Sequence, residues 1–136
     1  MAWQGDALPN DLSFKAAADL SALQYTFVKL DANGNVVACS AAGEKSVGVL
    51  QNKPKNGETA LVRPVGLSKI VASAAIAAGD YIATTAAGQA KTALRLVAAS
   101  GNASNVMGMA TRAAAGAGVV IQADIQRTGI WPTADV

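Results

Sequence analysis

The 136-residue sequence contains no histidine and a single cysteine, Cys39. Without histidine the chain lacks the most common general base, the Ser-His and Cys-His nucleophile pairs, and the usual ligand of zinc sites. One cysteine can form neither an intrachain disulfide nor a cysteine-rich metal site. The acidic residues are spread along the chain, and no cluster marks a paired-carboxylate site. We therefore expect a non-enzymatic protein that uses no cofactor and no metal.

Charge and aromatic side chains are also scarce. Charged residues make up 15% of the chain and aromatic residues 4%. A typical soluble domain has about 25% charged residues, so little charge is left to cover the surface of a monomer. Contiguous, weakly charged surface is typical of subunits that pack against one another. The composition is equally compatible with an Ala-rich monomer whose weakly charged surface binds no other subunit.

The basic residues do not form a nucleic-acid footprint. The net charge is +2, and the densest basic group, Lys53, Lys55 and Arg63, has no aromatic residue near it. Proteins that bind nucleic acid cluster basic residues on one face and interleave aromatics. We interpret the group as a solvated turn and expect no nucleic-acid partner.

No segment is suited to a membrane. The longest Ala-rich apolar stretch, Ile70 to Ala78, is far shorter than the roughly 20 residues that span a bilayer. The region after Met1 lacks the basic start and apolar run of a signal peptide. We expect a protein without a membrane partner, made in the cytoplasm and then soluble or assembled.

The chain alternates short β-forming segments with turn signals, which predicts a mainly β protein. The clearest turn is Asn33-Gly34, because both residues tolerate a positive φ. The strands that we expect are Tyr25–Leu30, Val36–Cys39, Ser46–Leu50, Glu58–Val65, Leu67–Ala72, Tyr81–Thr84, Val106–Ala110 and Val119–Ile125.

A weak internal repeat divides the chain into two halves. In each half an aromatic strand, beginning at Tyr25 or Tyr81, leads to a glycine turn and then to an apolar-Gly-apolar strand. Gly48 and Gly108 lie inside these strands, where glycine permits a bulge or a close backbone approach. Two such halves without a long helix predict a small antiparallel β-barrel or β-tulip-like domain.

The two ends of the chain differ from the repeated part. We expect residues 1–18 to form an extended N-terminal arm with at most one strand, 19–127 to form the β-rich domain, and 128–136 to form a short tail. Trp3 and Phe14 lie in the arm and Trp131 lies in the tail. Because tryptophan is enriched at binding hot spots, Trp3 and Trp131 are candidate contact residues, and Phe14 is a candidate beside them. The alternative is that each tryptophan folds back to cap its own domain.

Several short segments, in their order, resemble the capsid cement family of tailed phages. The segments are KSVGVLQNKP at Lys45–Pro54, Gly57-Glu58, the strand at Val65–Lys69, AIAAGDYI at Ala75–Ile82 and the opening segment Asp19–Asp31. The resemblance implies a β-barrel or β-tulip-like domain on the outer surface of a virus head. It also implies binding to the major capsid protein, often as a homotrimer or else a dimer, and no catalytic residues. A cement protein of this kind stabilises the capsid lattice of the virion.

Three other readings stay open. A small β-barrel binding module for oligosaccharide or single-stranded nucleic acid usually presents exposed aromatics on one face. Here only Tyr25, Phe27 and Tyr81 lie within the strands, and the alternation places Phe27 in the core. A minor enzyme is disfavoured by the missing histidine. Another minor virion subunit, such as a tail-tube or head-completion protein, is the alternative that the sequence distinguishes least well from a cement protein.

Overall fold

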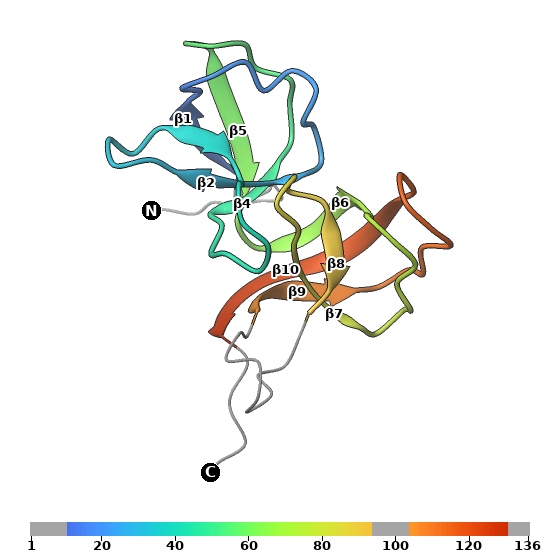
Figure 1. The fold of residues 1–136 in the computed structure, drawn as a ribbon. Helices are drawn as coiled ribbons and strands as arrows, with labels where there is room; N and C mark the ends of the chain where they lie inside the picture. Colours follow the sequence, from blue (N-terminus) through green and yellow to red (C-terminus); the bar gives the residue numbers. More distant parts are fainter. Residues whose placement is uncertain (1–10, 94–103, 131–136) are drawn as a thin grey trace, which may run out of the picture.

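The protein is built entirely from β-strands in the residues that the computed structural model describes, 11–93 and 104–130 (Figure 1). Ten strands form two five-stranded sheets. The strands are β1 (Leu12–Lys15), β2 (Phe27–Leu30), β3 (Val36–Ala38), β4 (Gly48–Leu50), β5 (Thr59–Arg63), β6 (Gly66–Val71), β7 (Tyr81–Thr84), β8 (Ala90–Thr92), β9 (Asn105–Ala110) and β10 (Val120–Ile130).

The two sheets have the same topology. Their strand orders are β1-β5-β4-β2-β3 and β6-β10-β9-β7-β8, so each strand of the second sheet repeats the one five earlier. All ladders are antiparallel. In each sheet a single parallel bridge brings the first and last strands together, Ala16 with Val36 and Ala72 with Ala90.

The expected mainly β, antiparallel fold is confirmed, but the expected single barrel is not what the described residues form. One bridge per sheet is not a continuous ladder, so neither sheet is a closed barrel. The chain changes sheets between β5 and β6, where only Pro64 and Val65 intervene. Proline has no amide hydrogen for a ladder, and it ends β5 there. β6 then pairs with β10 and starts the second sheet.

The two halves use the same turn between their second and third strands. Asp31 and Thr85 occupy the first position of the two turns, and each side chain accepts hydrogen bonds from two backbone amides within its turn. Gly34 and Gly88 follow with φ of 78° and 82°. The Asn33-Gly34 signal therefore identified a real hairpin turn, and a residue pair of lower turn propensity takes the same conformation in the second half.

The structure differs from the sequence prediction in which aromatic residue of the first half corresponds to Tyr81 of the second half. Tyr25 precedes β2 and has a φ of 65°, so it is not the counterpart of Tyr81. Phe27 pairs with Val49 as Tyr81 pairs with Met109, which makes Phe27 the counterpart of Tyr81. The expected burial of Phe27 is confirmed.

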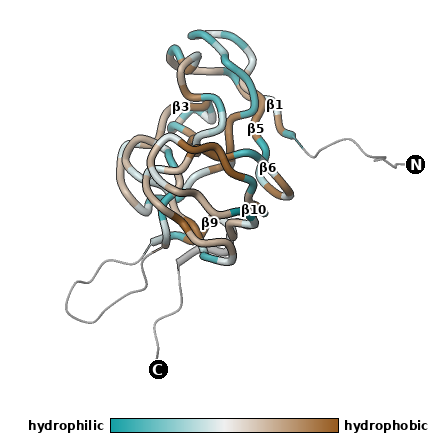
Figure 2. Tube along the Cα trace, turned by 90° about the vertical axis from the view of Figure 1, so that its right-hand side faces the viewer, coloured by the Kyte–Doolittle hydropathy of each residue, from teal (hydrophilic) through white to brown (hydrophobic). Residues whose placement is uncertain are grey.

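Two large clusters of buried side chains fill the described part of the molecule, beside a small one of Ala83, Ala93 and Val106. One lies within the first sheet and consists of Ala16, Leu20, Val28, Val36, Leu50, Ala60 and Val62. The larger one combines Phe27, Cys39 and Val49 of the first sheet with the interior of the second, including Ile70, Ile82, Met107 and Ile125. The hydrophobic colour in Figure 2 follows the strands, and the outer turns are hydrophilic. The second cluster therefore joins the two sheets into one core.

Gly48 and Gly108 allow one strand to approach its neighbour closely. A Cβ atom on Gly48 would lie 2.4 Å from the carbonyl oxygen of Arg63, and one on Gly108 would lie 2.3 Å from that of Asp124. Real Cβ atoms do not approach backbone oxygen so closely. The close approach that the sequence suggested is present at the same place in both sheets.

We predict that Gly108→Ala destabilises the protein by about 3 kcal/mol, because the added methyl group meets backbone that cannot move aside without breaking the ladder. Urea unfolding monitored by circular dichroism measures the loss. Gly116→Ala is the matched control, since its Cβ would meet nothing within 4 Å. Equal stability of the two variants would contradict the packing argument.

Candidate functional site

The three residues singled out in the sequence are not brought together by the described part of the structure. Phe14 lies in β1, opposite Ala60 of β5, and its half-buried side chain packs against the buried cluster of the first sheet. Trp3 and Trp131 lie outside the described residues. The contact role of all three therefore stays a prediction.

The described residues offer little chemistry. Their cysteine and acidic side chains do not gather in groups of three or more that could hold a metal ion. Across residues 11–93 and 104–130, no helix has the length and apolarity to cross a membrane. Cys39 is buried, and burial raises the pKa of its thiol to about 11. A thiol with such a pKa is protonated at neutral pH and is a poor nucleophile.

Three hydrogen bonds join the two sheets through the loop after β3. The Gly43 amide donates to the carbonyl oxygen of Thr84 at 2.8 Å. The Gly43 carbonyl oxygen accepts from the backbone amide and the side-chain amide of Asn105, at 3.0 and 2.9 Å. The loop of the first sheet is thus fixed between β7 and β9 of the second.

Glu44 holds this loop in shape. Its carboxylate accepts hydrogen bonds from the backbone amides of Ser40 and Ala41 and forms an ion pair with Lys29 at 3.0 Å. Partial burial alone would raise the pKa of Glu44, but the two amides and the Lys29 ammonium outweigh it, and the pKa is lowered. The ionised carboxylate is therefore the form that supports the loop.

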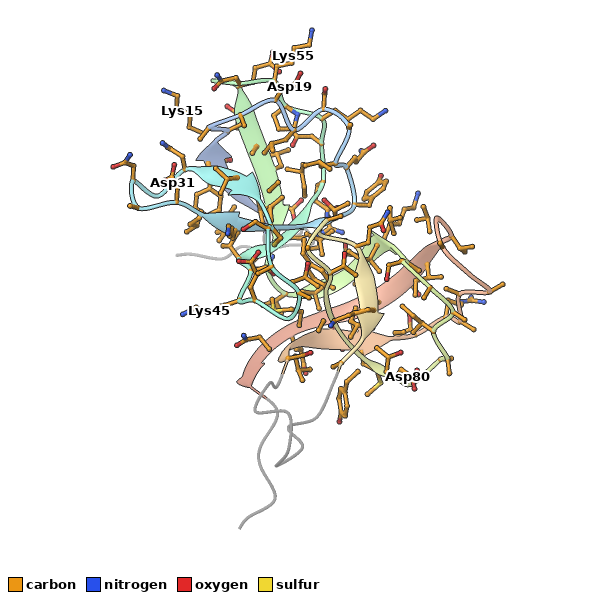
Figure 3. All side chains as sticks on the ribbon, viewed as in Figure 1. Lys15, Asp19, Asp31, Lys45, Lys55 and Asp80 are labelled. Carbon is orange, nitrogen blue, oxygen red and sulfur yellow. The ribbon has the colours of Figure 1, made fainter. Side chains whose placement is uncertain are left out.

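A cavity of about 480 Å³ opens beside this loop, between β2 and β9. It is lined by Lys29, Leu30, Lys45, Ser46, Val47, Asn105 and Met107. The Ser46 hydroxyl is buried and has no hydrogen-bond partner within the described part of the chain. Lys45 extends outward at this side of the first sheet (Figure 3). The cavity offers cationic groups and hydrogen-bond donors around an apolar lining, which suits contact with a partner rather than catalysis.

Arg63 is not part of a basic patch. Its guanidinium binds both carboxylate oxygens of Asp11, at 2.8 and 3.1 Å, and donates to the Leu67 carbonyl oxygen at 2.9 Å. Lys53 and Lys55 are exposed beside the turn that precedes β5. Arg63 thus connects the residue before β1 to β6, and the predicted solvated turn accounts for the two lysines.

Exposed apolar side chains gather on the outer face of the second sheet. Leu67 of β6 pairs with Asp124 of β10, Asp124 pairs with Met109 of β9, and Met109 pairs with Tyr81 of β7. These four residues form one row across the sheet, and its three apolar members are exposed. In the sequence, the alternation Met107-Gly108-Met109 indicated the strand but not that Met109 is exposed on this surface. An exposed apolar row of this kind indicates an interaction surface.

The fold and its surface therefore define an all-β, internally duplicated protein with a candidate interaction surface. No protein-family model matches the chain, and no curated protein matches its sequence. Its fold is similar to the crystal structure of the N base of head fiber gp8.5 in bacteriophage phi29. The TM-score is 0.62 at 17% sequence identity, over 90% of this chain and 98% of that one. The likeness is to a protein of a phage head, and it does not reach the cement family specifically.

We predict that Glu44→Gln lowers the free energy of unfolding by about 1 kcal/mol at pH 7, because charge-assisted hydrogen bonds become neutral ones. The folded-state pKa of Glu44 lies below its ordinary 4.5, so this stabilisation is present above pH 4.5 and is lost as pH falls through the lowered pKa. Urea unfolding of both proteins between pH 7 and pH 3 should show the difference vanish at the acidic end. The control Lys45→Gln, at an exposed lysine, should change stability little. A constant difference across this range would contradict the role of the carboxylate.

Proposed function

We propose that this protein is a structural subunit of a phage virion that binds the outer surface of the capsid and stabilises the lattice of the major capsid protein. The fold similarity to the N base of a phage head fiber carries the proposal, because it extends over nearly the whole of both chains. The order of sequence segments that resembles the cement family supports it independently.

The surface of the described residues is consistent with this role. A capsid-attached subunit holds a repeating lattice through many small contacts, and effective concentration turns weak single contacts into firm attachment. The row of Leu67, Met109 and Tyr81 provides exposed apolar area for contacts between copies of the subunit. An extended N-terminal arm could add a strand to a sheet edge of a capsid subunit. We further propose that the protein acts as a homotrimer, with a dimer as the alternative.

The fold neighbour favours one second candidate, a base that anchors a further structure to the head. Cement and fiber-base roles share capsid attachment and differ in whether lattice stability depends on the protein. The binding-module alternative receives less support. Phe27 is buried and Tyr25 lies before β2, so Tyr81 is the exposed aromatic side chain of the described strands, and one exposed aromatic ring makes no shared stacking platform.

We predict that the purified protein co-sediments with heads of its own phage and saturates at many copies spread over the lattice. Heads carrying it should then survive heating or low salt better than bare heads. Copies bound per head, from quantitative gel analysis of the pellet, measure the first result. Binding at a single vertex would instead favour a head-completion subunit, and absence of binding would reject capsid attachment. Binding without a gain in head stability would favour the base role over the cement role.

We also predict that Trp3→Ala weakens binding to heads by tenfold or more while leaving the fold intact, since loss of a tryptophan at a hot spot costs about 2 kcal/mol. Trp3→Phe keeps an aromatic contact and should retain most of the affinity. Co-sedimentation at increasing protein concentration gives both affinities, and circular dichroism checks the fold. Unchanged binding by a correctly folded Trp3→Ala protein would exclude Trp3 as an anchor.

A further inference from the structure

Because the two sheets repeat each other, the surface that each one hides can be compared position by position. The ladders make Phe27 and Val49 of the first sheet equivalent to Tyr81 and Met109 of the second. Phe27 and Val49 are fully buried in the cluster that joins the sheets. Tyr81 and Met109 are 45% and 38% exposed. The face that the first sheet buries against the second is thus open on the second; we call Tyr81 and Met109 the receiving face.

The opposite comparison gives the complementary result. Ser68 and Thr84 of the second sheet are buried where they meet the first sheet, through hydrogen bonds with Gln51 and Gly43. The ladders make Leu12 equivalent to Ser68, since they pair with Val62 and Ala123, which are themselves equivalent.

In the same way, Leu30 pairs with Val36 as Thr84 pairs with Ala90, so Leu30 is equivalent to Thr84. Leu12 and Leu30 are 43% and 40% exposed. We call Leu12 and Leu30 the presenting face.

The contact between the two sheets joins two different faces, so it is head to tail. The counterpart of each of these faces is exposed at one end of the molecule. The neighbouring turn shows the same asymmetry. Gly88 approaches the Phe27 carbonyl oxygen so closely that a Cβ would lie 2.6 Å from it, whereas a Cβ on Gly34 would meet nothing within 4 Å. Asp31, next to Leu30, and Asp80, next to Tyr81, lie at opposite sides of the molecule (Figure 3). One molecule cannot bring its own two open faces together.

Charged side chains lie beside both open faces. In the receiving face, Asp124 lies directly opposite Met109. In the presenting face, Leu30 shares a cavity lining with Lys29 and Lys45. Glu44 pairs with Lys29, and the neighbouring Asp31 accepts hydrogen bonds from the backbone amides of its own turn, so Lys45 is the cation that can face Asp124 of the next molecule.

We propose that the occupant of each open face is a second copy of this chain, with the receiving face of one molecule packed on the presenting face of the next. This repeats between molecules the contact that joins the two sheets within one. A head-to-tail interface of this kind is heterologous, so it closes into a ring or continues as a filament. The inference rests on the self-association included in the proposed function, and a closed ring of three copies would give the trimer.

Two single variants test the interface without any capsid. Leu30→Asp damages only the presenting face, and Met109→Asp damages only the receiving face. Because an aspartate buried without a partner is strongly unfavourable, each should weaken self-association at least about a hundredfold. Mixed together, they retain one intact face each, so they should form a one-to-one dimer and no larger species. Size-exclusion chromatography with light scattering measures the masses, and circular dichroism checks that both variants fold.

Val119→Glu is the matched control. Val119 is 38% exposed, the same as Met109, but its counterpart Glu58 is also exposed, so neither belongs to the repeated contact. The control should assemble like the unaltered protein. An unaltered protein that stays monomeric, variants that still assemble, or a mixture that stays monomeric would each overturn the proposal. Binding of the monomeric variants to heads is a separate readout, so capsid attachment can hold where the interface fails.

Discussion

The contact on which the rest of the structure depends lies between the start of β2 and the turn that carries Gly88. The Phe27 amide donates to the Gly88 carbonyl oxygen at 2.7 Å, and the absence of a side chain at Gly88 permits this approach. With backbone against backbone, the Phe27 and Val49 side chains enter the buried cluster of the second sheet. Short sheets built from small residues bury little apolar surface alone. The junction gives two such sheets one shared core.

The two halves of the chain share the residues that the fold requires and differ in the residues that form surfaces. Both halves keep the strand glycines, Gly48 and Gly108, and a turn whose first side chain accepts two backbone amides. Backbone geometry requires glycine at the two strand positions and a side-chain acceptor at the start of each turn. The junction positions differ instead: the second sheet buries polar Ser68 and Thr84 where the first exposes leucines. The same backbone arrangement thus forms a buried contact between the sheets in one sheet and an exposed surface in the other.

Sequence reasoning reached the features that local chemistry decides. Eight of the ten described strands, all except β1 and β8, follow from propensity and alternation, as do the Asn33-Gly34 turn, the close approach at Gly48 and the burial of Phe27. The sequence did not predict which distant segments pair, because no residue near β1 indicates that β5 is its neighbour. The division into two sheets depends on such pairings. Of the candidate site, the sequence assigned Phe14 to an extended arm, and the structure places it in β1 of the first sheet. The loop contacts of Gly43 and Glu44 left no local sequence pattern from which to predict them.

The two kinds of contact proposed for this protein use different parts of the chain, and this separation has a physical consequence. Self-association is proposed at strand positions, Tyr81 and Met109 against Leu12 and Leu30. The counterparts Phe27 and Val49 form the corresponding contact inside the molecule. Attachment to the head is assigned to the arm that carries Trp3. An assembly formed beforehand would present several arms at fixed spacing, so each added arm binds at high effective concentration. A weak single contact is then sufficient, because the loss of one arm leaves the others bound while it rebinds.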